Sequence, residues 1–133
     1  MNPKVEERLG ATHLIWLTTV TPEGMPKPSL VWFWWDGDSF LIYSRPEMVK
    51  LSNIQANPSV ALNLDAMGRG TEEVTIFDGV AAVDPGAPPA VAHPEYLAKY
   101  RSLIEDELET TVEQFSASYS VPIRVTPTST RVW

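Results

Sequence analysis

Segment 43–50, Tyr-Ser-Arg-Pro-Glu-Met-Val-Lys, has residue types that could hold a phosphate group. It runs from an expected strand into an expected helix, and a helix N-terminus offers free backbone N–H groups and a partial positive charge. Arg45 and Lys50 add two full positive charges, and Ser44 adds a hydroxyl. Ser44 and Glu47 also fit an S-x-x-E capping box, in which case the two cations would simply be solvated. The two interpretations are compatible, because a capping hydroxyl can still bind a phosphate oxygen.

The aromatic segment 28–35, Pro-Ser-Leu-Val-Trp-Phe-Trp-Trp, could form the wall of a ligand pocket. Alternate residues of a strand face opposite sides, and here both faces are apolar, so both must be covered. One face can fill a β-barrel, whereas the other needs a helix, a partner subunit or a planar ligand. For any single tryptophan, a place in the core or in a subunit interface is the simpler interpretation. Ser29 and Val31 favour a ligand more, because small residues leave room and backbone groups for a flat ring.

The other polar residues predict little chemistry. Asn53, taken alone, is more typical of a capping or solvated residue than of a ligand contact. His13 and His93 are isolated from other residues at metal-ligand spacing, so no metal site is expected. The chain has no cysteine, which excludes disulfides, thiolate metal sites and cysteine nucleophiles. It also lacks the G-x-S-x-G and G-x-x-x-x-G-K-[ST] motifs, so hydrolase and nucleotide-triphosphatase functions have no support.

Most of the elements that must position these residues are short strands. Strands are expected over 13–21, 27–35, 39–44, 59–65, 72–83, 121–125 and 129–133. The first three should form an antiparallel meander, Gly79 should mark a bend, and Pro127 should separate the last two. Helices are expected over 3–10, 46–56 and 95–118, the last in one or two pieces. This pattern predicts an α+β fold built around a β-barrel.

Length and charge limit the classes of function. The chain has 133 residues, which predicts one domain. Its net charge of −7 argues against a nucleic-acid partner, because phosphate neutralisation needs a basic face. No apolar run is long enough to span a bilayer, and the N-terminus lacks the order of a signal peptide. A cytoplasmic protein with no membrane partner is therefore expected.

The order of these motifs resembles the pyridoxamine 5′-phosphate oxidase-like superfamily of flavin-binding split β-barrels. The segments that carry the resemblance are Leu17–Pro26, the aromatic strand through Trp35, Asp36–Asp38, Tyr43–Pro46 and Lys50–Ile54 with Asn57-Pro58. The C-terminal segment 119–133 looks like the branch of deazaflavin-dependent oxidoreductases, which use coenzyme F420. The resemblance covers nearly the whole chain. It implies an α+β, mainly β fold, an antiparallel split β-barrel with short flanking helices, as a single cofactor-binding domain over 1–133.

The resemblance also implies a homodimer with a cofactor at the subunit interface. The residues implied for the phosphate are Ser44, Arg45, Lys50 and Asn53. Those implied for the ring, along the second strand, are Ser29, Leu30, Val31 and Trp32. The partner subunit would cover the ring through the loop near Arg69 and the strand near Gly79. The family often has a second basic residue before the lysine, whereas this chain has Glu47-Met48-Val49, so the phosphate would be held by two cations.

Three functions are consistent with the resemblance. The first is a reductase that uses F420 to transfer hydride to a small, apolar, unsaturated substrate, without a dedicated catalytic residue; Tyr43, Tyr96 and His93 are weak candidates for proton delivery. The second is an FMN-dependent oxidoreductase. FMN ends in one phosphate, whereas the tail of F420 continues into glutamates and would need further cations. Lys27, Arg124 and Arg131 could supply them if they converge. The third is a non-catalytic protein that binds flavin, F420 or haem.

Overall fold

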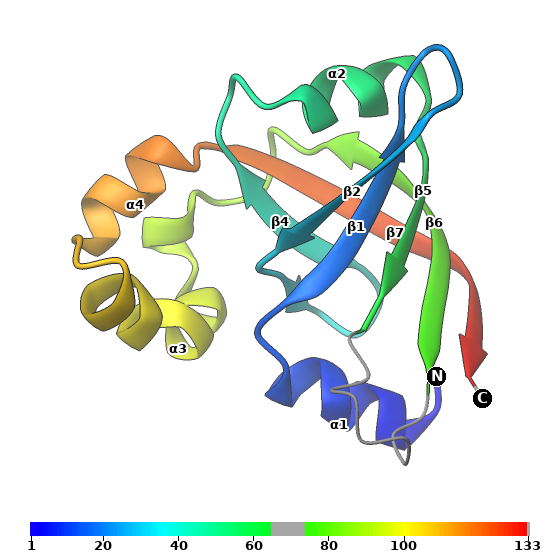
Figure 1. The fold of residues 1–133 in the computed structure, drawn as a ribbon. Helices are drawn as coiled ribbons and strands as arrows, with labels where there is room; N and C mark the ends of the chain where they lie inside the picture. Colours follow the sequence, from blue (N-terminus) through cyan, green and yellow to red (C-terminus); the bar gives the residue numbers. More distant parts are fainter. Residues whose placement is uncertain (65–73, 133) are drawn as a thin grey trace.

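The computed structural model of the protein describes residues 1–64 and 74–132, and its centre is a seven-stranded antiparallel sheet (Figure 1). The strands are β1 Ile15–Val20, β2 Pro26–Val31, β3 Trp34–Trp35, β4 Phe40–Ser44, β5 Ser59–Asn63, β6 Thr75–Val83 and β7 Val121–Val132. The helices are α1 Pro3–Ala11, α2 Val49–Ala56, the 3-10 turn η1 Ala90–Ala92, α3 Pro94–Ser102, the π-helical turn η2 Leu103–Glu107 and α4 Val112–Ser118. Helix α2 lies over one end of the barrel, α1 at the other, and α3 and α4 form a layer on one side.

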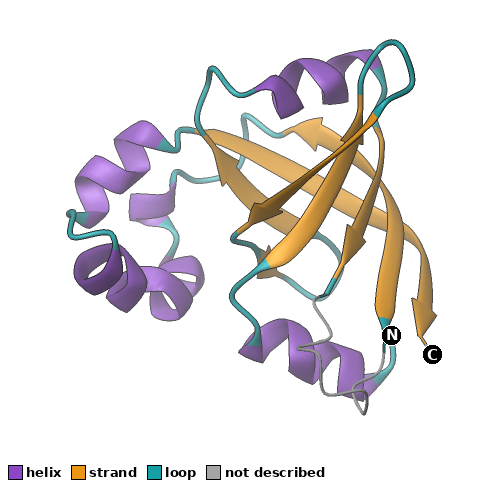
Figure 2. Ribbon diagram, in the orientation of Figure 1, coloured by secondary structure: helices purple, strands orange, loops and turns teal. Residues whose placement is uncertain are grey.

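The sheet curls into a split barrel, and a short connection joins its two edge strands (Figure 2). The strand order is β2-β1-β5-β6-β7-β4-β3, so β2 and β3 are opposite edges. Only Trp32 and Phe33 separate them in the chain, and so short a connection spans at most roughly 11 Å. The predicted fold, α+β and mainly β with an antiparallel split barrel, is confirmed.

The predicted meander of the first three strands is wrong. The expected strand 27–35 is two strands on opposite edges: β2 pairs with β1, and β3 pairs with β4. The break lies at Phe33, whose backbone N–H donates to the hydroxyl of Tyr100 at 2.9 Å instead of to a neighbouring strand. A side chain from α3 therefore takes the place of a ladder partner and lets the chain cross from one edge to the other.

The C-terminal strand also differs from expectation, because Pro127 does not interrupt β7. The register shifts at Asp78/Gly79, so that Gly79 is paired with Pro127 and Asp78 with Ser129. Because of this irregularity in the pairing, β7 can contain Pro127 without ending there. A Cβ on Gly79 would lie 3.0 Å from the carbonyl oxygen of Thr126, so a glycine permits the close approach of β6 and β7.

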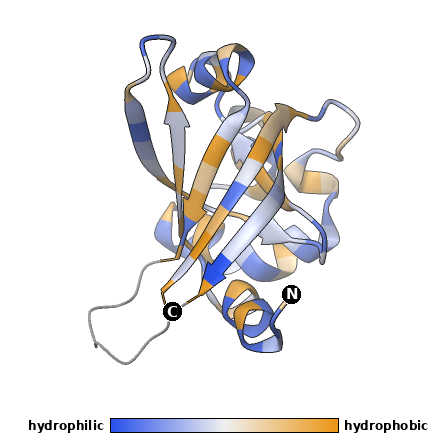
Figure 3. Cartoon of the chain, turned by 90° about the vertical axis from the view of Figure 1, so that its right-hand side faces the viewer, coloured by the Kyte–Doolittle hydropathy of each residue, from blue (hydrophilic) through white to orange (hydrophobic). Residues whose placement is uncertain are grey.

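The chain passes from β2 to β3 over residues 31–34, here called the crossing segment. Two apolar clusters hold the fold together, one on each face of this segment. Val31 and Phe33 lie in the barrel core, whereas Trp32 and Trp34 pack against the other cluster, which lies under α3 and α4. Helices α3 and α4 together are here called the helical layer. The predicted division of the aromatic segment into two faces is therefore confirmed. Apolar and hydrophilic residues alternate along the strands on the opposite side of the barrel, as expected for strands with one face inward (Figure 3).

Lys99 and Tyr100 of α3 fasten the helical layer to the barrel at this crossing. The ammonium of Lys99 donates to the carbonyl oxygens of Leu9 and Phe33, both at 3.1 Å, and lies 3.8 Å from the centre of the Phe33 ring. The hydroxyl of Tyr100 lies 2.6 Å from the carbonyl oxygen of His13 and 2.9 Å from that of Phe33. The crossing segment is therefore fixed from the outside by two neighbouring residues of one helix.

Candidate functional site

A pocket of about 350 Å³ lies between the barrel, the helical layer and the start of α2. Its lining comprises Leu14, Leu30, Val31, Trp32, Tyr43, Ser44, Arg45, Met48, Lys50, Tyr96, Leu108, Phe115 and Tyr119. The ends of β2 and β4 supply the barrel side, and α3 and α4 supply the facing side. The structure thus brings the predicted ring residues Leu30, Val31 and Trp32 into one cavity with the predicted phosphate residues Ser44, Arg45 and Lys50.

The other predicted site residues lie elsewhere. The hydroxyl of Ser29 is directed at the carbonyl oxygen of Leu17 on β1, 3.5 Å away. The buried amide of Asn53 donates to the hydroxyl of Thr19 at 3.1 Å, which ties α2 to the barrel. Gly79 is packed against β7, and Arg69 lies outside the described residues. Ser29, Asn53 and Gly79 are therefore not part of this cavity, and their contribution to cofactor binding stays a prediction.

The pocket has a positive end where β4 leads into α2. Helix α2 begins at Val49, its N-cap residue is Met48, and no side chain caps it. The capping-box interpretation is wrong: Ser44 donates to the carbonyl oxygen of Arg45 at 3.0 Å, and Glu47 pairs with the Arg45 guanidinium at 3.0 Å. The Leu51 N–H donates to the carbonyl oxygen of Met48 at 3.1 Å, so the N–H groups of Val49 and Lys50 are the ones at the start of α2 that remain available to an anion.

Lys50 differs from Arg45 in having no carboxylate partner among the described residues. Its side chain is half-buried, and burial lowers its pKa below the ordinary value. No carboxylate in the described part of the chain forms an ion pair with it, whereas Arg45 already has a partner. That pair with Glu47 is exposed, and exposed pairs contribute little stability, so an incoming anion could replace the carboxylate. An anion bound here would compensate the desolvation of Lys50 directly.

The rest of the pocket wall is apolar and aromatic. Trp32 stacks on the ring of Tyr100 with 4.7 Å between centroids and an interplanar angle of 12°, and its edge meets Phe115 at 5.5 Å. Phe115 in turn contacts Tyr119 at 4.7 Å. Sequence analysis missed Phe115 and Tyr119 as pocket residues. The sequence predicted a helix over 95–118, which contains Phe115, but it could not show that this helix covers the end of β2.

The family model for pyridoxamine 5′-phosphate oxidase matches residues 1–129. The chain belongs to the pyridoxamine 5′-phosphate oxidase family. The predicted superfamily is thus confirmed. Among curated proteins, none matches the sequence.

Solved structures show the same fold as this member of the pyridoxamine 5′-phosphate oxidase family. A conserved hypothetical protein from Mycobacterium tuberculosis is 23% identical, with 100% of this chain and 84% of the other covered and a TM-score of 0.79. An F420 reductase is 25% identical over 95% of this chain and 94% of its own, with a TM-score of 0.68. An FAD-binding protein from Mesorhizobium loti is 17% identical, with 97% of this chain and 89% of the other covered and a TM-score of 0.68.

The further cations expected for the tail of F420 do not converge on the pocket of this pyridoxamine 5′-phosphate oxidase family member. Arg124 donates to carboxylate oxygens of Asp84 at 2.9 Å and Asp36 at 3.2 Å. Arg131 is paired as well, 3.1 Å from an oxygen of Asp78. None of the three expected cations lines the pocket. The histidines are also outside it, and His93 accepts the N–H of Tyr96 through Nδ1 at 3.1 Å, as the N-cap of α3.

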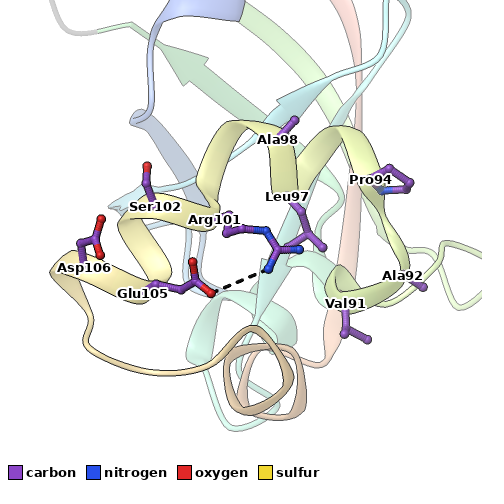
Figure 4. Close-up of a pocket in the computed structure, with 9 residues that line it drawn as sticks. All are labelled: Val91, Ala92, Pro94, Leu97, Ala98, Arg101, Ser102, Glu105 and Asp106. Carbon is purple, nitrogen blue, oxygen red and sulfur yellow. Dashed lines mark ion pairs between the residues drawn. The ribbon is translucent and has the colours of Figure 1, made fainter.

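A larger hollow, of about 720 Å³, runs along the outer face of α3 (Figure 4). Of its lining residues, only Leu97 is buried, and its charged side chains include Arg101 and Glu105, which pair with each other at 3.7 Å. It is an open surface groove without the buried polar groups of the smaller pocket. Over the described residues, no cluster of side chains could hold a metal ion, and no helix has the length and apolarity to cross a membrane.

Proposed function

We propose that this member of the pyridoxamine 5′-phosphate oxidase family is an oxidoreductase that uses coenzyme F420 to transfer hydride to a small, apolar, unsaturated organic substrate. The observation that carries the proposal is Lys50, a half-buried cation without a carboxylate partner among the described residues, beside the open N-terminus of α2 and an apolar pocket. The family match and the likeness to an F420 reductase support a flavin-type cofactor.

The residues of the pocket fit such a group. Arg45, Lys50 and the first N–H groups of α2 would hold its phosphate, and Leu30 to Trp32 would hold its ring. When bound, the deazaflavin supplies the hydride chemistry. The chain itself orients the ring and the substrate and excludes water, through the aromatic side chains of Trp32 and Phe115.

FMN is the second candidate cofactor, and the count of cations favours it. Arg45 and Lys50 are the basic residues that line the pocket, which suits one phosphate. Arg124 and Arg131 are held by carboxylates away from it and offer no second site for the longer tail of F420.

Titration with FMN, F420 and haem tests the proposed function. We expect quenching of tryptophan fluorescence with F420 or FMN, because Trp32 lines the pocket. Turnover of reduced F420 with a panel of enones and quinones then separates an enzyme from a non-catalytic carrier. A protein that binds neither flavin nor deazaflavin at micromolar concentration would contradict the proposal.

We also propose that the protein is a homodimer that closes the pocket from outside. Leu14, Leu30, Met48 and Leu108 line the pocket, yet each is at least 40% exposed. A cluster of exposed large apolar side chains around a cavity is typical of an interaction surface. A second copy of the chain would bury this rim and cover the ring.

Leu30→Glu tests the dimer. Burying a carboxylate against the apolar rim should weaken self-association on the order of a hundredfold, so that a dimeric protein sediments as a monomer at micromolar concentration. Val91→Glu is the matched control, because Val91 is 42% exposed but lies on η1, outside this pocket. A wild-type protein that is already monomeric, with or without cofactor, would contradict the proposed assembly.

A further inference from the structure

Three buried tyrosines, Tyr43, Tyr96 and Tyr100, belong to the apolar cluster under α3 and α4, and they differ in what their hydroxyl groups contact. The hydroxyl of Tyr43 donates to the carbonyl oxygen of Pro88 at 2.6 Å. The hydroxyl of Tyr100 accepts from the Phe33 N–H and lies close to two carbonyl oxygens. The hydroxyl of Tyr96 has no hydrogen-bond partner in the part of the chain that the structure describes.

This isolation is unusual for a hydroxyl so deeply placed. Tyr96 is 1% exposed, and its ring is enclosed by Tyr43 and Tyr100, each with its centroid 4.8 Å away. Buried hydroxyl groups in proteins nearly always have a partner, because an unpaired one has lost its bonds to water without replacing them. Tyr96 is also one of the residues that line the pocket. Because Tyr96 belongs to the lining, a ligand bound in the pocket is the candidate for the missing acceptor.

The surroundings restrict what that acceptor can be. Burial, followed by the neighbouring tyrosines, raises the pKa of Tyr96, so its hydroxyl stays protonated and acts as a neutral donor. The rings packed around Tyr96 are aromatic, whereas the positive charges of the pocket belong to Arg45 and Lys50. An uncharged oxygen on a flat, apolar molecule suits these aromatic surroundings better than a phosphate or carboxylate.

We propose that the hydroxyl of Tyr96 donates a hydrogen bond to a carbonyl oxygen of the molecule bound in the pocket. The inference rests on the proposed function for the nature of that molecule, either the cofactor ring or an unsaturated carbonyl substrate. Both have carbonyl oxygens, and the experiment below distinguishes them. Tyr96 would thus select carbonyl-bearing ligands, while Arg45 and Lys50 select the phosphate.

Tyr96→Phe removes the hydroxyl and leaves the ring in place. Without ligand, we expect the variant to have a thermal midpoint equal to or above that of the wild type, because a buried polar group without a partner is lost. Tyr43→Phe is the matched comparison: its hydroxyl has an acceptor, so its midpoint should fall. A clear decrease in the midpoint of Tyr96→Phe would mean that this hydroxyl is satisfied within the protein, and would overturn the proposal.

Binding of defined probes identifies the acceptor. Dissociation constants of wild type and Tyr96→Phe are measured for FMN, for F420, and for menadione against its carbonyl-free analogue 2-methylnaphthalene. If the acceptor is on the cofactor ring, Tyr96→Phe should weaken FMN or F420 roughly tenfold. If the acceptor is on the substrate, the variant should bind menadione more weakly by a similar factor, and its affinity for 2-methylnaphthalene should not change.

These arms separate this inference from the proposed function. A wild type that binds no flavin refutes the proposed cofactor, and Tyr96 is then judged on menadione against 2-methylnaphthalene alone. Equal affinities of wild type and Tyr96→Phe for every probe would overturn the role of the hydroxyl, even if the flavins bind tightly. So would a wild type that binds none of the four probes, or an equal loss for menadione and its carbonyl-free analogue.

Discussion

Lys50→Ala is expected to weaken the binding of a phosphate-bearing cofactor by on the order of 1.5–3 kcal/mol, roughly ten- to a hundredfold in Kd. The substitution removes a charge-assisted contact from a site where Arg45 is the other basic residue of the lining. Because Arg45 is already expected to contact the phosphate, it cannot supply a second charge in place of the one that is lost. Fluorescence titration with FMN and F420 measures the loss directly.

Two comparisons make the Lys50 result specific. Lys4→Ala removes the same charge from the first turn of α1, at the opposite end of the barrel from α2, and should leave the affinity unchanged (Figure 1). Riboflavin, which is FMN without its phosphate, should bind wild type and Lys50→Ala equally. If Lys50→Ala binds FMN as well as the wild type, the phosphate site is elsewhere in the protein.

The affinity should also depend on pH in a way that identifies Lys50. Burial lowers the pKa of this ammonium below its ordinary value of 10.5, so it begins to lose its proton at a lower pH than a solvated lysine. Its contribution to phosphate binding is complete while it is protonated and is lost as the pH rises through that lowered pKa. Affinity should therefore fall on the alkaline side in the wild type, and this part of the decrease should be missing in Lys50→Ala.

The aromatic segment 28–35 shows how far sequence analysis reaches for the fold. Alternation along a strand is a local property, and it correctly placed Val31 and Phe33 on one face and Trp32 and Trp34 on the other. The break between β2 and β3 was not predictable, because the partner of the Phe33 N–H is the hydroxyl of Tyr100, 67 residues later. Such a contact leaves no trace in the local pattern.

The candidate site divides in the same way. Its positive end was predictable, because Arg45 and Lys50 stand at a strand-to-helix transition that the sequence shows directly. The capping box failed because Glu47 pairs with Arg45, and the helix starts later than its spacing requires. The facing wall, with Phe115, depends on how α4 packs against the barrel, and that packing is set by tertiary contacts rather than by helical periodicity.

Tyr100→Phe should be the most destabilising single-atom deletion at the crossing segment, by about 2–4 kcal/mol. The hydroxyl accepts the Phe33 N–H at 2.9 Å and lies 2.6 Å from the carbonyl oxygen of His13. Phenylalanine keeps the ring that stacks on Trp32, so the variant isolates the polar contacts. The Phe33 N–H would be left buried without an acceptor, and each such group costs roughly 1–3 kcal/mol. For a domain with a total stability of about 5–15 kcal/mol, this is a large fraction.

Tyr96→Phe is the matched control for this measurement, because the same atom is removed from the same helix at an equally buried tyrosine whose hydroxyl has no partner among the described residues. Urea unfolding, followed by tryptophan fluorescence, should show a lower midpoint than the wild type for Tyr100→Phe and no decrease in the midpoint for the control. Amide exchange at Phe33 should accelerate only in Tyr100→Phe, since its N–H loses its acceptor there. Equal stability of the two variants would mean that the crossing is held by Lys99 and by ring packing, and that the switch of the chain between the two sheet edges does not depend on the hydroxyl.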